Sequence, residues 1–112
     1  MPTALQLLKS ELFRVLANPT RIRILEQLVG GERTVQDLQT ALSLGQPIVS
    51  QQLAVLRGRK VVVVRREGTL AYYTVASPLV ADILRLSREF LNQQLAGNRS
   101  ILREIQREGR RG

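Results

Sequence analysis

One stretch of the sequence changes from the hydrophobic period of helices to that of strands, and this change limits the fold more than any other feature. From residue 34 to 58, apolar residues recur every three or four positions, which predicts two short helices. Gly45 lies between them, where glycine permits a sharp turn. Two β-prone runs around Gly68 follow in residues 61–75 and predict a hairpin. The expected order is helix, turn, helix and two-stranded hairpin, which is that of a winged helix-turn-helix.

The second of these helices, residues 46–58, has two chemically different sides. Val49, Leu53 and Leu56 are spaced i, i+4 and i+7, as a core-facing stripe requires. The opposite side contains no acid and carries Gln46, Pro47, Ser50, Gln51 and Ala54. Amides and hydroxyls read base edges in the major groove of DNA. A merely solvated face would usually contain Glu and Lys, so this composition favours a helix that reads DNA.

Two helices precede this unit, separated by an Asn-Pro pair at residues 18–19 that can cap and start the second one. Their apolar positions are Leu5, Leu8, Leu12 and Leu16, then Ile22, Leu25 and either Leu28 or Val29. Arg21 and Arg23 lie near the start of the second helix, where the helix dipole disfavours cations. Two explanations remain open: a nearby phosphate, or pairing with Glu26 or Glu11.

The helix-turn-helix itself begins with a capping signal. Thr34 and Asp37 have the spacing of a capping box. Val35, Leu38 and Leu42 follow at helical spacing and are expected to face the core.

The hairpin carries two consecutive cations, Arg65 and Arg66, where its first strand leaves the body. Such residues suit contact with a flanking phosphate or entry into the minor groove. Tyr72 and Tyr73 point to opposite faces because side chains alternate along a strand. One is expected to pack on the core, while the other covers the wing or approaches DNA.

A last helix is expected to start at Ser77-Pro78 and to extend to about residue 108, either continuous or broken at residues 97–98. Its apolar positions include Leu79, Ile83, Leu86, Phe90 and Leu91. A broad apolar face here and on the first helix requires a partner, and a second copy of the chain is the simplest one.

Composition limits the chemistry of the chain. Its 112 residues include 17 basic and 9 acidic side chains, a net charge of +8, which favours a polyanionic partner. There is no Cys and no His, which excludes disulfides, soft-metal sites and catalysis by thiolate or imidazole. The longest aliphatic string is residues 61–64, so no signal peptide or membrane span is expected and a cytoplasmic location is the default.

Three motifs in this order closely resemble the ArsR/SmtB-type bacterial repressors. They are residues 17–25 (ANPTRIRIL), residues 46–57 (QPIVSQQLAVLR) and residues 65–68 (RREG) with Tyr72-Tyr73. The resemblance covers roughly residues 12 to 95. It implies a homodimer joined through its first and last helices, with two reading helices in successive major grooves of a palindromic operator.

The sequence departs from the metal-sensing members of that family. Where they carry Cys on the helix before the turn, this chain has Thr34 and Gln36. Others use His with carboxylates on the last helix, and here Asp82 and Glu89 occur without His. Gln52 replaces the usual His of the reading helix, which is expected to change a core or interface contact. No metal and no cofactor is therefore expected.

The resulting prediction is a mainly α (α+β) fold, one domain of residues 1–112 with about five helices and a two-stranded wing. Residues 1–16 and 78–108 are expected to dimerise, residues 34–58 to form the helix-turn-helix and residues 61–75 the wing. The expected DNA contacts are Thr34, Gln46, Pro47, Ser50, Gln51, Arg57, Arg65, Arg66 and Thr69, with Lys60 as a further phosphate contact. The expected dimer contacts are Leu5, Leu8, Leu12, Ile83, Leu86, Phe90 and Leu91.

The leading hypothesis is a dimeric repressor that binds double-stranded operator DNA. The alternative is a nucleoid-type architectural protein with little sequence preference. An interaction module that has lost DNA binding would show acids on the reading face, and there are none there. An enzyme is not expected, because no nucleophile has an adjacent base and no Gly-rich phosphate loop occurs. An unidentified effector between the end helices, the operator and the inducing signal are left open.

Overall fold

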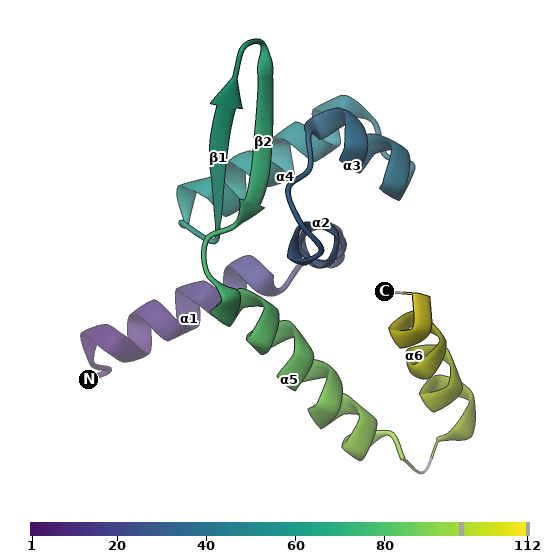
Figure 1. Ribbon diagram of the computed structural model, residues 1–112. Coiled ribbons are helices and arrows are strands. Elements are labelled where there is room, and N and C mark those ends of the chain that lie inside the picture. Colours follow the sequence, from purple (N-terminus) through teal and green to yellow (C-terminus); the bar gives the residue numbers. More distant parts are fainter. Residues whose placement is uncertain (97, 112) are drawn as a thin grey trace.

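A computed structural model describes residues 1–96 and 98–111, which form six helices and one antiparallel hairpin (Figure 1). Gly97 and Gly112 lie outside the described residues. The elements are α1 (Ala4–Leu16), α2 (Pro19–Val29), α3 (Val35–Leu42), α4 (Gln46–Gly58), β1 (Val62–Glu67), β2 (Leu70–Val75), α5 (Pro78–Gln94) and α6 (Arg99–Arg111). This is the expected mainly α winged helix-turn-helix.

The C-terminal helix is interrupted, which accounts for a sixth helix where about five were expected. α5 ends at Gln94 and α6 begins at Arg99, so residues 78–108 do not form one continuous rod. Asn98 caps α6, because its side-chain oxygen accepts from the N–H of Ile101 at 3.3 Å. Figure 1 shows α6 running back from the far end of α5 toward α2.

The core lies around α2, which packs against α1, α3, α4, α5 and β2. The buried side chains are Val15, Ile24, Leu25, Leu28, Leu38, Leu42, Val49, Leu53, Leu56, Val61 and Val62. Of the two residues considered for the end of the α2 stripe, Leu28 is buried, whereas Val29 is 42% exposed. Ile24 is fully buried although the single stripe expected for this helix missed it, because α2 is covered from several sides. Ile22 is only half-buried.

The hairpin turns through Gly68, whose φ of +60° favours glycine. Its register pairs Val64 with Tyr73 and Arg65 with Tyr72. Tyr73 packs against the core, whereas Tyr72 lies under the Arg65 guanidinium at 4.6 Å. The two tyrosines therefore take opposite faces, as the alternation of a strand requires.

Two helices, α1 and α5, extend from the body (Figure 1). Both carry exposed apolar side chains. On α1 these include Leu5, Leu8 and Phe13, which are about 60% exposed. On α5 they are Leu79, Leu86, Phe90 and Leu91. No helix within the described residues is long and apolar enough to cross a membrane.

Within the described residues, the two arginines of α2 do not form the ion pairs with Glu26 or Glu11, and both side chains bind carbonyl oxygens at helix ends instead. The phosphate explanation stays a prediction. Arg21 donates from Nε to the Val15 carbonyl at 2.6 Å and from Nη1 to Oε1 of Gln52 at 3.0 Å. Arg23 donates from Nη2 to the Leu42 carbonyl at 2.9 Å. The last carbonyls of a helix lack partners within it and carry partial negative charge. Arg21 thus ties the end of α1 to α4.

Substituting Arg21 tests this tie. Arg21→Ala removes charge-assisted hydrogen bonds to α1 and α4 and is expected to lower the free energy of unfolding by about 2 kcal/mol. Arg14→Ala is the control, because the exposed Arg14 side chain forms no hydrogen bond within the described residues and its loss is expected to change stability by less than about 0.5 kcal/mol. Urea unfolding at one fixed protein concentration measures both, and equal losses would refute the role of Arg21.

Candidate nucleic-acid interface

Packing of α4 determines which of its sides faces outward. Val49, Leu53 and Leu56 are at most 1% exposed and pack in the core between α2, α3 and β1. This confirms the predicted stripe. The opposite side, from Gln46 to Ala54, is therefore presented to solvent.

The exposed side of α4 carries uncharged donors and acceptors in a defined arrangement. Gln46 donates from Nε2 to the Ser50 hydroxyl at 2.7 Å, so two predicted base-reading residues lie side by side, one helical turn apart. Gln51 is exposed, and its amide has no hydrogen-bond partner within the described residues. Ile48 is 46% exposed on this surface. The sequence interpretation did not include it, because it considered only polar and small side chains on this side of the helix. An exposed aliphatic group there suits the methyl group of thymine.

The start of α4 is open. Its cap residue is Gly45, which forms no side-chain cap hydrogen bond, and Pro47 occupies the first turn. Backbone N–H groups at such a terminus have no acceptor within the helix, and the helix dipole makes this end attractive to anions. The geometry suits a phosphate oxygen.

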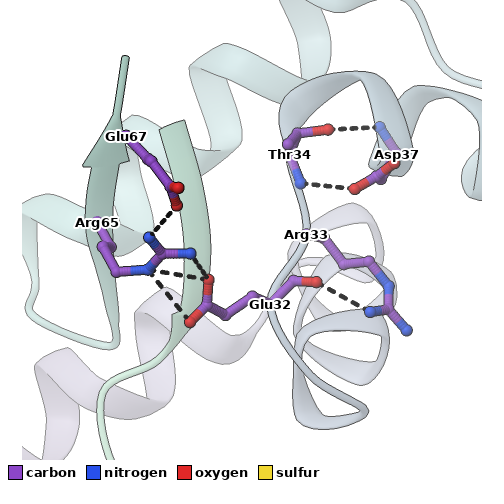
Figure 2. Close-up of polar contacts among 6 residues, drawn as sticks. All are labelled: Glu32, Arg33, Thr34, Asp37, Arg65 and Glu67. Carbon is purple, nitrogen blue, oxygen red and sulfur yellow. Dashed lines mark hydrogen bonds and ion pairs between the residues drawn. The ribbon is translucent and has the colours of Figure 1, made fainter. Parts of the chain in front are cut away.

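α3 starts with the predicted capping box (Figure 2). The Thr34 hydroxyl accepts from the Asp37 N–H at 3.1 Å, and the Asp37 carboxylate accepts from the Thr34 N–H at 2.9 Å. The hydrogen bond from the Thr34 backbone lowers the pKa of Asp37. Thr34 lies at the end of the loop that joins α2 to α3, and its hydroxyl proton remains available to an outside acceptor.

Arg65 is paired with acids of its own chain (Figure 2). Its guanidinium donates to Oε2 of Glu32, at 2.8 Å from Nη2 and 3.2 Å from Nε, and Nε also lies 3.4 Å from Oε1. Nη1 donates to Glu67 at 2.7 Å. The same guanidinium lies over the Tyr72 ring, with Cζ 4.6 Å from the ring centroid, in a cation–π contact. Glu32 lies in the loop before α3, so Arg65 joins the outer face of the wing to the helix-turn-helix. Arg33 reinforces this link through paired backbone hydrogen bonds with Tyr73, at 2.8 and 3.0 Å.

Arg66 differs from its neighbour because successive side chains alternate across a strand. It is opposite Ala71 in the register, is exposed, and forms no ion pair within the described part of the chain. Thr69 lies in the exposed turn at the tip, beside Gly68. Arg57, in the last turn of α4, is also exposed. The structure thus leaves Arg66 and Arg57 open to an outside anion.

The carboxylates of α5 are engaged with an arginine. Asp82 and Glu89 both pair with Arg85, at 3.6 and 3.1 Å. Among the residues that the structure describes, no three His, Cys, Asp or Glu side chains are grouped closely enough to hold a metal ion. Glu11, considered as a partner of Arg21, pairs with Arg59 at 2.7 Å.

Sequence comparison identifies relatives over most of the chain. Residues 18–62 match the family described as "Bacterial regulatory protein, arsR family". The HTH-type transcriptional regulator Rv0081 of Mycobacterium tuberculosis is 40% identical over 103 residues, which are 91% of this chain and 90% of that protein. A probable mercury resistance operon repressor of Streptomyces lividans is 40% identical over 76 residues, 68% of this chain and 61% of that protein.

Solved structures show the same architecture. The crystal structure of Rv0081 matches with a TM-score of 0.78 at 41% identity, covering 86% of this chain and 97% of that one. The solution structure of Mb0332 from Mycobacterium bovis, described as a homodimeric winged helix-turn-helix DNA-binding domain, matches with a TM-score of 0.77 at 33% identity and covers 85% and 88%. Because a relative at 40% identity is matched over nine-tenths of its length, and because the arsR model matches α2 through the start of β1, this chain belongs to the arsR family of bacterial regulatory proteins, which are transcriptional regulators and not enzymes.

Proposed function

We propose that the protein is a dimeric repressor that binds palindromic operator DNA, with α4 in the major groove and the wing on the flanking backbone. The observation that carries this proposal is the exposed, acid-free side of α4, which presents amides, a hydroxyl and an aliphatic group. These are the groups that distinguish base pairs in the major groove. The open start of α4 supplies a phosphate site beside them. Such a regulator would act in the cytoplasm, where bacterial DNA lies.

The proposed DNA-binding residues fall into two groups, those that contact base edges and those that contact or position the phosphate backbone. Gln46, Ser50 and Gln51 would read base edges, with Pro47 fixing the first turn of the helix. Arg57, Arg66, Thr34 and Thr69 would contact the phosphate backbone, joined by Lys60. Arg65 is also a predicted DNA contact, but its pairing with two carboxylates favours a positioning role. It would hold the wing at the angle from which Arg66 reaches DNA.

The second copy would cover the apolar faces of α1 and α5. Leu5, Leu8, Leu86 and Phe90 are all at least 53% exposed, and exposed apolar side chains grouped in this way are typical of interfaces. Leu12 is partly buried in the core of its own subunit, so its share of the interface would be smaller. The homodimeric state of the related Mb0332 domain supports this arrangement.

Substitutions of Gln51 and Arg66 should affect DNA binding differently. Gln51→Ala removes an amide that reads a base, and the affinity ratio of operator over random duplex is expected to fall about tenfold. Arg66→Ala should weaken both duplexes alike and lower the slope of log K against log salt by about 0.9 for each of the two copies. Fluorescence anisotropy across a salt series measures both quantities. Equal losses of specificity would show that the roles are misassigned, and a wild-type ratio far below about 10³ would favour the architectural alternative.

Arg65 should act through wing geometry. Arg65→Gln is expected to change the salt slope by less than half as much as Arg66→Gln, because the native side chain is already paired with Glu32 and Glu67. It should also speed amide hydrogen exchange at Tyr73 and Arg33, whose paired backbone bonds lie beside the lost contact. A salt slope altered as strongly as by Arg66→Gln, with unchanged exchange, would instead make Arg65 a direct phosphate contact.

Charge in the subunit seam should separate the copies. Leu86→Glu places a carboxylate in the proposed interface and is expected to yield monomers in sedimentation experiments. Operator affinity should fall by at least about a hundredfold, since a monomer engages one half-site. Val29→Glu is the matched control, because Val29 is 42% exposed at the end of α2 and lies outside the proposed seam. A dimeric Leu86→Glu protein would place the interface elsewhere.

A further inference from the structure

A groove is lined by residues of α1, α2, α5 and α6. Figure 1 shows that α6 returns toward α2 on the side of the molecule away from the wing. The groove encloses about 360 Å³, within the range of about 300–1,000 Å³ found for small-molecule sites. Each of its four helices contributes one stripe. The apolar lining is Phe13 and Leu16 from α1, Ala17 just after it, Ile22 from α2, Ile83, Leu84 and Leu91 from α5, and Ile105 from α6.

The groove is lined by three charged side chains, two of them acidic, and by the hydroxyl of Ser87. Glu26 of α2 and Glu108 of α6 both line it, and neither carboxylate has an ion-pair partner within 4 Å among the described side chains. The third charged group, Arg88, donates from Nη2 to the Ile105 carbonyl at 3.2 Å. Its guanidinium lies so close to Gly109 that a Cβ there would approach it to 3.0 Å. Arg88 is therefore held against the backbone of α6.

The two carboxylates affect one another across the groove. Partial burial raises the pKa of Glu26, and the charge of Glu108 raises it further, whereas Arg88 opposes both effects. A cation between the two carboxylates would relieve this repulsion. Neutral or anionic molecules would leave it in place.

We propose that this groove binds a lipophilic organic cation, whose hydrocarbon part contacts the apolar walls while its ammonium group lies between Glu26 and Glu108. An anionic ligand would have Arg88 as its one positive contact, and that side chain is already committed to α6. A neutral apolar ligand would contact the walls but would form no charge-assisted contact with the exposed carboxylates of Glu26 and Glu108. Charge complementarity thus selects the cation.

Calorimetric titration of the full-length protein with benzyltriethylammonium, without DNA, tests the site. The cation is expected to bind at least tenfold more tightly than 4-phenylbutyrate, an anion with a similar aromatic body, or than neutral benzyl alcohol. Glu26→Gln and Glu108→Gln keep the side-chain size and should each weaken binding of the cation about tenfold. Since no DNA is present, the result is independent of operator binding.

Glu104→Gln is the matched control, because Glu104 is an exposed acid on α6 that does not line the groove, and the variant should bind the cation within about twofold of the original chain. Circular dichroism confirms that each variant is folded, and two separate acid variants guard against the failure of one. The proposal is overturned if the cation shows no binding at about 10 mM, if 4-phenylbutyrate binds equally well, or if all three glutamine variants behave alike.

Discussion

Burial of one stripe of α4 against α2 is the constraint on which the rest of the structure depends. Val49, Leu53 and Leu56 are removed from water almost completely, and each such side chain contributes about 1.5–3 kcal/mol relative to exposure. Rotating α4 to place Gln51 inward would expose these side chains and bury an amide without a partner. Both changes would lower the stability of the folded state. The outward direction of the polar side is therefore a consequence of the core.

Polar ties then fix what the core leaves free. Arg21 joins the end of α1 to the half-buried Gln52 of α4, so Gln52 takes part in an internal contact between helices. Arg65 does the same for the wing, through Glu32. The exposed Arg65–Glu32 ion pair adds little stability by itself, whereas the hydrogen bonds of the part-buried Arg21 also stabilise the fold. Both ties affect orientation: they hold the end of α1 and the wing relative to the helix-turn-helix.

Local chemistry explains why the sequence predicts the elements well and some side-chain roles poorly. Caps such as Asn18 and the Thr34 box depend on residues three apart, and the stripe of α4 on residues within two turns, so both are visible in the chain. By contrast, Gln52 is 31 residues from its partner Arg21, and Glu32 is 33 residues from its partner Arg65. Burial of Ile24 and the return of α6 likewise depend on tertiary packing. In the interface, the position of α4 was predictable, whereas the difference between Arg65 and Arg66 required the carboxylate of Glu32.

The groove and the proposed subunit seam share structural elements, which would give a physical route from ligand to DNA. Phe13 and Leu91 line the groove and are also among the exposed apolar side chains of α1 and α5. A ligand can shift an equilibrium only by its differential affinity for two arrangements. A cation that separates α1 from α5 would favour subunit arrangements with a different spacing of the two α4 helices, and half-site spacing is set by the pitch of DNA. Because Val15 of α1 is a core residue and α5 packs against α2, such a movement would also have to be accommodated by the core around α2.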